Sequence, residues 1–269
     1  MPDAPSEEPI LCDIRDGVMR ITLNRPDAAN AIAADGRETI IRLLSEADAD
    51  PDVRVVVIGA VGKYFCSGAD LRGIASSQGS VRVPGSTMRT MLNAAQRLIA
   101  AVLDCGKPVV CAVQGPATGM GAHLAFASDM VVATDDAFFA LPFIQRGLAL
   151  DAAGAYLMPR RIGLQKAKEL AFLGDRLPAE EARALGLVNQ VVSAADFPAA
   201  VDALASRLAG AATIAIMVSK RMLNASLDID RNAAFLSEAM AQEVNGQTED
   251  SKEGVRAFIE KRPTNFKGR

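Results

Sequence analysis

Two short turns flanked by glycine carry the residue types of this 269-residue chain that best suit ligand chemistry. In residues 66–70, small side chains leave the backbone open to the close approach of a ligand. The turn at residues 119–121 opens a predicted helix, whose free N–H groups and dipole favour an anion nearby. A carbonyl oxygen that gains negative charge during a reaction needs such a pair of preorganised donors. Either turn alone is also consistent with ordinary chain punctuation.

Two ionisable side chains are candidates for proton transfer. His123 is the one histidine of the chain, and an imidazole titrates near neutral pH. On an apolar helix it could equally be a packed side chain that makes one hydrogen bond. Asp151 would have its pKa raised by desolvation beside an apolar pocket, which suits a proton-shuttling base. Because aspartate is also a favoured helix N-cap, a capping role for Asp151 stays open.

Other catalytic and metal-binding classes find little support. Ser67, His123 and Asp151 could be imagined as a triad, but the serine lies in no G-x-S-x-G elbow. Cys66 has no basic residue nearby except Lys63, so a reactive thiolate is not expected. The four cysteines form no C-x-x-C pair and there is a single histidine, so we expect no metal site.

Composition and charge indicate that nucleic acids and membranes are not binding partners of this protein. The net charge of −3 and the pI near 5.4 disfavour the broad basic face of a nucleic-acid binder. Aromatic residues make up 4% of the chain and tryptophan is absent, which disfavours base-stacking platforms. The N-terminus lacks the pattern of a signal peptide, and the most apolar stretch, residues 109–133, is interrupted by polar residues. We therefore expect a soluble, cytoplasmic protein that binds neither nucleic acid nor membrane.

Strands alternate with helices in the first half of the chain, and the last third is mostly helical. Residues 14–23 alternate around an Asp-Gly pair, which predicts a hairpin. The Gly- and Ser-rich residues 72–86 are the best candidate for a lid. Further strands are predicted at 53–59, 108–113, 130–133, 137–139 and 187–192, and helices at 31–47, 87–104, 195–208, 212–227 and 230–244. This order indicates a layered α/β domain with a helical appendage.

Five segments, in order and spacing, resemble the enoyl-CoA hydratase/isomerase family, also called the crotonase superfamily. They are residues 23–31, 65–71, 107–133, 174–187 and 253–262, within a match that covers about residues 10–266. The resemblance implies an α/β crotonase-type β-β-α spiral. Its core with the acyl-CoA site would span residues 1–195, and a helical C-terminal trimerisation region would span residues 196–269. It also implies a homotrimer or a dimer of trimers, which apolar helices at 195–244 support.

The resemblance assigns binding roles as well. The backbone N–H groups of Ser67 and Met120 would hold the thioester oxygen of an acyl-CoA. Coenzyme A enters as part of the substrate, so no separate cofactor and no metal are implied. The residues that would contact the CoA portion are Arg25, Ala28, Ser67, Gly68, Ala69, Asp70, Leu71, Phe258 and Lys261.

The chain departs from the family at two positions. Hydratases of this family hold and activate a water with two glutamates, and this chain has His123 and Phe143 there. Asp151 matches a functional aspartate of related dienoyl-CoA isomerases and aryl-CoA dehalogenases. We therefore expect an acyl-CoA enzyme with isomerase-like or single-acid chemistry through Asp151, and His123 as the second proton-transfer residue. The alternative is a non-catalytic acyl-CoA-binding protein of the same fold.

Overall fold

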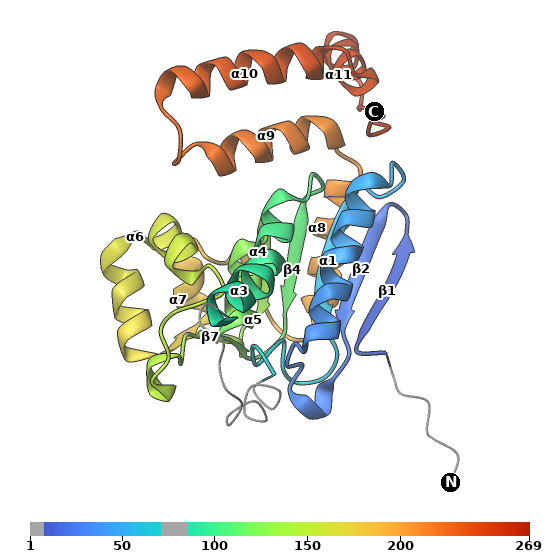
Figure 1. Ribbon diagram of the computed structural model, residues 1–269. Coiled ribbons are helices and arrows are strands. Elements are labelled where there is room, and N and C mark those ends of the chain that lie inside the picture. Colours follow the sequence, from blue (N-terminus) through green and yellow to red (C-terminus); the bar gives the residue numbers. More distant parts are fainter. Residues whose placement is uncertain (1–7, 71–85) are drawn as a thin grey trace.

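The computed structural model describes residues 8–70 and 86–269. Leu71 and almost all of the predicted lid segment, residues 72–86, lie outside the described residues. Figure 1 shows a sheet with helices on both of its faces and three further helices at one end.

The fold opens with the predicted β-hairpin. Arg15 at the end of the first strand lies opposite Val18 at the start of the second. The two turn residues, Asp16 (φ 52°) and Gly17 (φ 77°), both adopt left-handed backbone conformations. A two-residue hairpin turn needs positive φ at both positions, and the Asp-Gly pair tolerates it. The hairpin prediction is confirmed.

The main sheet has six strands in the order β1-β2-β3-β4-β6-β9. They are β1 (Ile10–Arg15), β2 (Val18–Leu23), β3 (Val55–Ala60), β4 (Val109–Val113), β6 (Met130–Thr134) and β9 (Gln190–Val192). Only the hairpin pair is antiparallel, and every later pair is parallel. Parallel strands are covered on both faces, which explains why β3 and β4 are continuous apolar runs.

Alternate residues of β3 face two different layers. Val56 and Ile58 pack against one group of helices, whereas Val55 and Val57 pack against α8 on the opposite face. The first group comprises α1 (Ala34–Ala49), α4 (Ala95–Asp104) and α5 (Met120–Ala127), and α8 spans Phe197–Ala209. α8 lies within the predicted C-terminal region of residues 196–269 and packs on the sheet, and the boundary between residues 195 and 196 stays a prediction. The three helices that follow α8 form a helical extension.

A smaller sheet of three strands, in the order β5-β7-β8, lies next to α5. Its strands are β5 (Ala117–Thr118), β7 (Phe138–Ala140) and β8 (Arg176–Pro178). The same part of the chain also forms the 3-10 turn η2 (Ile144–Arg146) and the helices α6 (Gly154–Leu173) and α7 (Ala179–Ala184). A second 3-10 turn, η1 (Pro26–Ala28), follows β2, and α3 (Ser86–Asn93) precedes α4. The predicted helix at 87–104 is thus two helices that meet at Ala94.

The helical extension consists of α9 (Thr213–Ala225), α10 (Arg231–Gly246) and α11 (Glu249–Glu260). In Figure 1 it occupies the upper end of the view, with α9 and α10 antiparallel. The guanidinium of Arg54 donates hydrogen bonds to Thr213 and to the carbonyl of Ala211, and so ties the extension to the start of β3. Many apolar side chains here are exposed, among them Leu223, Phe235, Leu236, Met240, Val244, Val255, Phe258 and Ile259. A single chain does not cover these faces, as the sequence pattern predicts.

Within the described ranges, no single helix is both long enough and apolar enough to cross a membrane. Only α8 and α9 taken together reach that length and composition, and they meet at an angle of 101°. The apolar face of α8 packs on the sheet.

Candidate active site

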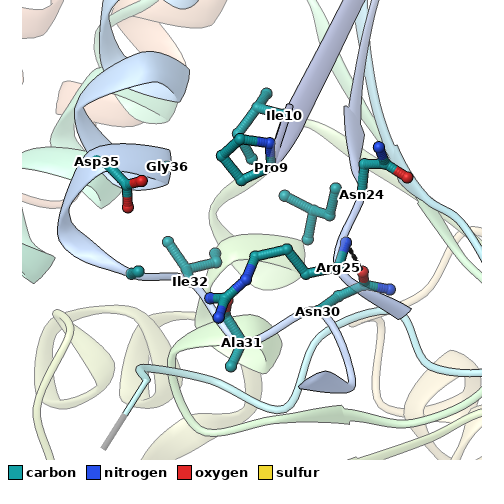
Figure 2. Close-up of a pocket in the computed structure, with 11 residues that line it drawn as sticks. Pro9, Ile10, Asn24, Arg25, Asn30, Ala31, Ile32, Asp35 and Gly36 are labelled. Carbon is teal, nitrogen blue, oxygen red and sulfur yellow. Dashed lines mark hydrogen bonds between the residues drawn. The ribbon is translucent and has the colours of Figure 1, made fainter. Parts of the chain in front are cut away.

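Asn30 holds the turn that follows β2. Its side chain is buried and its backbone is left-handed (φ 53°). Its Oδ1 accepts the N–H of Arg25 at 2.8 Å, an interaction drawn in Figure 2, and its Nδ2 donates to the carbonyls of Val61 (2.9 Å) and Tyr64 (2.7 Å). Asparagine tolerates positive φ and offers both a donor and an acceptor, which this position requires.

The side chain of Arg25 joins two segments of the predicted CoA path. Its guanidinium donates to the carbonyl of Ala31 at 2.8 Å and forms a half-buried ion pair with Asp70 at 3.0 Å. The turn at 25–31, which includes Ala28, is thereby fixed beside residues 66–70. Figure 2 shows Arg25 beside a small cavity of about 10 Å³, which has room for about one water molecule.

The amide of Ser67 is not available to a ligand. It donates to the carbonyl of Ala29 at 3.0 Å, so the prediction that Ser67 supplies an oxyanion donor is wrong. The amide of Ala69 is oriented differently. Ile32 donates its N–H to Gly68 O at 2.8 Å and accepts the N–H of Asp70 at 3.1 Å, so the residues on either side of Ala69 are both bonded to Ile32. The N–H of Ala69 therefore points away from residue 32. It has no acceptor among the described residues, and Ala69 is exposed.

Met120 supplies a second unused amide. It is the first residue of α5, and no acceptor for its N–H occurs in the part of the chain that the structure describes. The preceding Gly119 has φ 54° and ψ −122°, a conformation that glycine alone adopts readily, and its own N–H donates to Ala140 O at 2.9 Å. The first turn of a helix leaves such N–H groups without partners and favours negative charge near them.

The two glycine-flanked turns meet backbone to backbone. A Cβ atom at Gly121 would lie 2.6 Å from the carbonyl oxygen of Cys66, and one at Gly68 would lie 3.0 Å from Thr118 O and 3.5 Å from Met120 N. Thr118 also donates its N–H to Cys66 O at 2.8 Å. Only residues without side chains allow this approach, which brings the strand segment carrying Ala69 next to the start of α5.

Cys66 serves this packing and is not a nucleophile. The thiol is fully buried, and burial raises its pKa to about 12. A protonated, inaccessible thiol does not attack a substrate. Over residues 8–70 and 86–269, no group of three His, Cys, Asp or Glu side chains is placed to share a metal ion.

His123 lies on α5, completely buried. Its ring stacks nearly parallel to that of Phe143, with the centroids 5.8 Å apart and an interplanar angle of 11°. Burial lowers the pKa of His123 to about 4, although the backbone of Asp151 offsets this in part. No described group meets hydrogen-bond geometry with either ring nitrogen. A buried imidazole whose pKa lies well below neutral is uncharged at pH 7, which disfavours the predicted role of His123 as a second acid–base residue.

Asp151 does not cap α6. The N-cap residue is Ala153, which is left-handed (φ 59°), and no side chain bonds to the first turn of the helix. The Asp151 carboxylate is half-buried and makes no hydrogen bond or ion pair with another described residue. Burial raises its pKa. The capping alternative is therefore wrong, and the carboxylate remains available for proton transfer.

A chain of contacts connects the start of α5 with the Asp151 turn. A Cβ at Gly119 would lie 3.7 Å from Cζ of Phe143, and Phe143 stacks on His123. The His123 ring in turn lies against Gly154, three residues after Asp151. These contacts join the start of α5 to the turn that carries Asp151. Phe143, not a carboxylate, lies between Gly119 and His123 in this series of contacts.

Phe258 and Lys261 lie at the opposite end of the molecule. Phe258 is 85% exposed on α11, and Lys261 is the left-handed C-cap of that helix. In Figure 1, α11 is at the upper end beyond α9, whereas the start of α1, next to the 25–31 turn, is at the lower end. One chain therefore does not bring these two residues to its own predicted CoA path.

Comparison with known proteins tests this architecture over the whole chain. The family description "Enoyl-CoA hydratase/isomerase" matches residues 13–269. The chain belongs to the enoyl-CoA hydratase/isomerase family. The crystal structure of an enoyl-CoA hydratase/isomerase from Cupriavidus metallidurans superposes with a TM-score of 0.91 at 32% identity, covering 98% of each chain. The predicted α/β crotonase-type fold is confirmed.

Relatives within the enoyl-CoA hydratase/isomerase family differ in reaction. A Rhodobacter capsulatus protein named as a probable enoyl-CoA hydratase is 36% identical over 96% of this chain and 97% of its own. The 1,2-epoxyphenylacetyl-CoA isomerase of Escherichia coli is 33% identical over 97% of this chain and 98% of its own. Family membership makes this chain an enzyme of the hydratase/isomerase type. The reaction has to be argued from the site.

Proposed function

We propose that this enzyme acts on acyl-CoA thioesters, whose thioester oxygen accepts hydrogen bonds from the backbone N–H groups of Ala69 and Met120. One observation carries the proposal: two amides that have no acceptor among the described residues lie on backbone segments that touch through Gly68 and Gly121. A pair of fixed donors stabilises the negative charge of an enolate, and one such donor contributes about 3–4 kcal/mol in acyl-transfer enzymes. Ala69 replaces Ser67 in this role.

Asp151 is the proposed proton-transfer residue. The carboxylate has no partner in the described part of the chain, and burial raises its pKa toward the range useful for a base. It would remove a proton from a carbon of the acyl chain, the electrons passing to the thioester oxygen, and return that proton to another carbon. Such a transfer needs one carboxylate. Phe143 leaves no partner for two-carboxylate water activation, so isomerisation or single-acid chemistry is favoured.

The CoA portion would follow the two segments that the Arg25–Asp70 ion pair joins. These are the 25–28 turn and residues 67–70, with Leu71 following them. Phe258 and Lys261 would reach a CoA site only from α11 of a neighbouring chain. The exposed apolar faces of α9, α10 and α11 support assembly into a homotrimer or a dimer of trimers. Coenzyme A would enter only as part of the substrate, with no further cofactor.

The test is turnover of a panel of enoyl-CoA and dienoyl-CoA thioesters by the wild type and by Asp151→Asn. We expect Asp151→Asn to bind the thioesters and to lose turnover by roughly 100-fold or more, a typical contribution of a general base. Asp52→Asn, at an exposed position just after the C-terminal end of α1, is the matched control and should keep full activity. Tight binding without any turnover by the wild type would instead indicate an acyl-CoA-binding protein.

A further inference from the structure

The His123 ring occupies a defined place on α5. The side chain is fully buried and stacks on Phe143. Neither ring nitrogen meets full hydrogen-bond geometry within the described ranges, and the backbone of Asp151 compensates for burial only in part, which is a costly state for a buried polar side chain. Such a cost calls for an explanation. The explanation lies in what the ring touches beyond Phe143.

The ring and Gly154 are complementary in shape. A Cβ at Gly154 would lie 2.3 Å from Cε1 and 2.5 Å from Nε2 of His123, which is closer than real Cβ contacts come. Gly154 does not have a positive φ, so its backbone does not by itself require glycine. The absent side chain is therefore explained by the ring, together with the flexible end of Leu150, 3.0 Å from the same point.

The segment from Asp151 to Gly154 is strained. Ala152 (φ 47°) and Ala153 (φ 59°) are consecutive left-handed residues, and neither is glycine. Each such residue costs on the order of 1–3 kcal/mol and persists only where the surroundings hold it. The N–H of Gly154 donates to Asp151 O at 2.9 Å and closes the turn, and Ala152 is buried in the core. The ring supports this turn at Gly154.

We propose that His123 is a positioning residue, whose neutral ring supports the turn at residues 151–154 and so fixes the place of the Asp151 carboxylate. The inference rests on the proposed function in one respect, namely that Asp151 transfers the proton. It departs from an acid–base role for His123 because it requires the volume of the ring and not its titration. A displacement of about 1 Å in a reacting group can cost on the order of 100-fold in rate.

A size exchange between the two residues tests the proposal. Gly154→Ala adds a methyl group where the ring lies, and His123→Ala removes the ring. We expect each single variant to lower kcat by roughly 30- to 100-fold with little change in KM, since the turn moves while the CoA path does not. The double variant should recover at least about threefold of kcat relative to Gly154→Ala, because the new methyl group then has space. A double variant no better than Gly154→Ala would overturn the proposal.

His123→Phe keeps a ring and removes both nitrogens. Its kcat should stay within about fivefold of the wild type, with the same acidic limb in the pH profile. If His123→Phe has the same unfolding temperature as the wild type but its kcat falls about 100-fold, the imidazole nitrogens act in the reaction and the proposal is wrong. Asp151→Asn in the same assay separates the two hypotheses: if it retains turnover, the proposed function fails whatever the size exchange shows.

Discussion

The carbonyl oxygen of Cys66 lies where a side chain of Gly121 would begin, 2.6 Å from the Cβ position. This approach sets α5 against the segment that carries Ala69, and it underlies the proposal that the amides of Ala69 and Met120 act together. The Cβ and Sγ of Cys66 lie at 2.7 and 2.8 Å from the same point, so the backbone and the side chain both exclude any residue larger than glycine.

Gly121→Ala should therefore separate the two turns. The added methyl group overpacks a buried site, which costs about 1–3 kcal/mol of the free energy of unfolding. Denaturant unfolding measures this cost, and the same sample should show weakened turnover. Gly246→Ala, in α10 with nothing within 4 Å of the added Cβ, is the matched control and should not destabilise the protein. Equal unfolding midpoints for the two variants would contradict this account.

Gly68→Ala should damage catalysis more than stability. Its Cβ would lie 3.5 Å from Met120 N, near the space assigned to the thioester oxygen. We expect kcat to fall by roughly 100-fold, as when one oxyanion donor is removed. Gly186 also has a positive φ, but nothing lies within 4 Å of a Cβ added there. Gly186→Ala is therefore a control that introduces backbone strain without a steric clash. The proposal fails if Gly186→Ala loses as much activity as Gly68→Ala.

The raised pKa of Asp151 predicts a pH dependence. As a base, the carboxylate must be ionised, so kcat/KM should fall as pH drops through a value above that of ordinary aspartate. The contribution of Asp151 to the free energy of unfolding changes with pH in the opposite direction to its contribution to activity. The folded state holds the proton more tightly than the unfolded chain, so Asp151 costs stability as pH rises above the unfolded pKa. Asp151→Asn should thus be inactive at pH 7 and slightly more stable there, which thermal unfolding would measure. A less stable Asp151→Asn variant would contradict the assignment.

The Arg25–Asp70 ion pair should act on substrate binding. Removing either partner takes away one of the contacts that hold the 25–31 turn beside residues 67–70, and we expect KM for the acyl-CoA to rise by roughly tenfold while kcat changes little. A double-mutant cycle with Arg25→Met and Asp70→Asn should give a coupling energy of about 0.5–3 kcal/mol. Arg42→Met breaks an exposed pair with Glu46 on α1 and serves as the control. Additive effects at residues 25 and 70 would refute the coupling.

Local signals were sufficient for much of the fold. The Asp16-Gly17 turn, the β-branched run of β3 and the glycines at 119 and 121 each predicted the element that the structure contains, because each depends on backbone preferences or burial within a few residues. The family resemblance predicted the fold and brought the two turns together. It also predicts that Asp151 lies near the reacting atoms, and the Asp151 carboxylate has no partner among the described residues.

Only the tertiary structure decided which groups at the site are available. In a regular strand the N–H groups of residues 67 and 69 would point to the same side, but Gly68 between them has a positive φ of 103°. Contacts with Ala29 and Ile32, which come from a different part of the chain, leave Ser67 bonded and Ala69 without an acceptor among the described residues. Whether Asp151 caps a helix depended on a turn through Ala153, and whether His123 titrates depended on its burial beneath α6. These outcomes arise from contacts between residues distant in sequence, and spacing along the chain carries no information about the direction of an N–H group or the depth of a side chain.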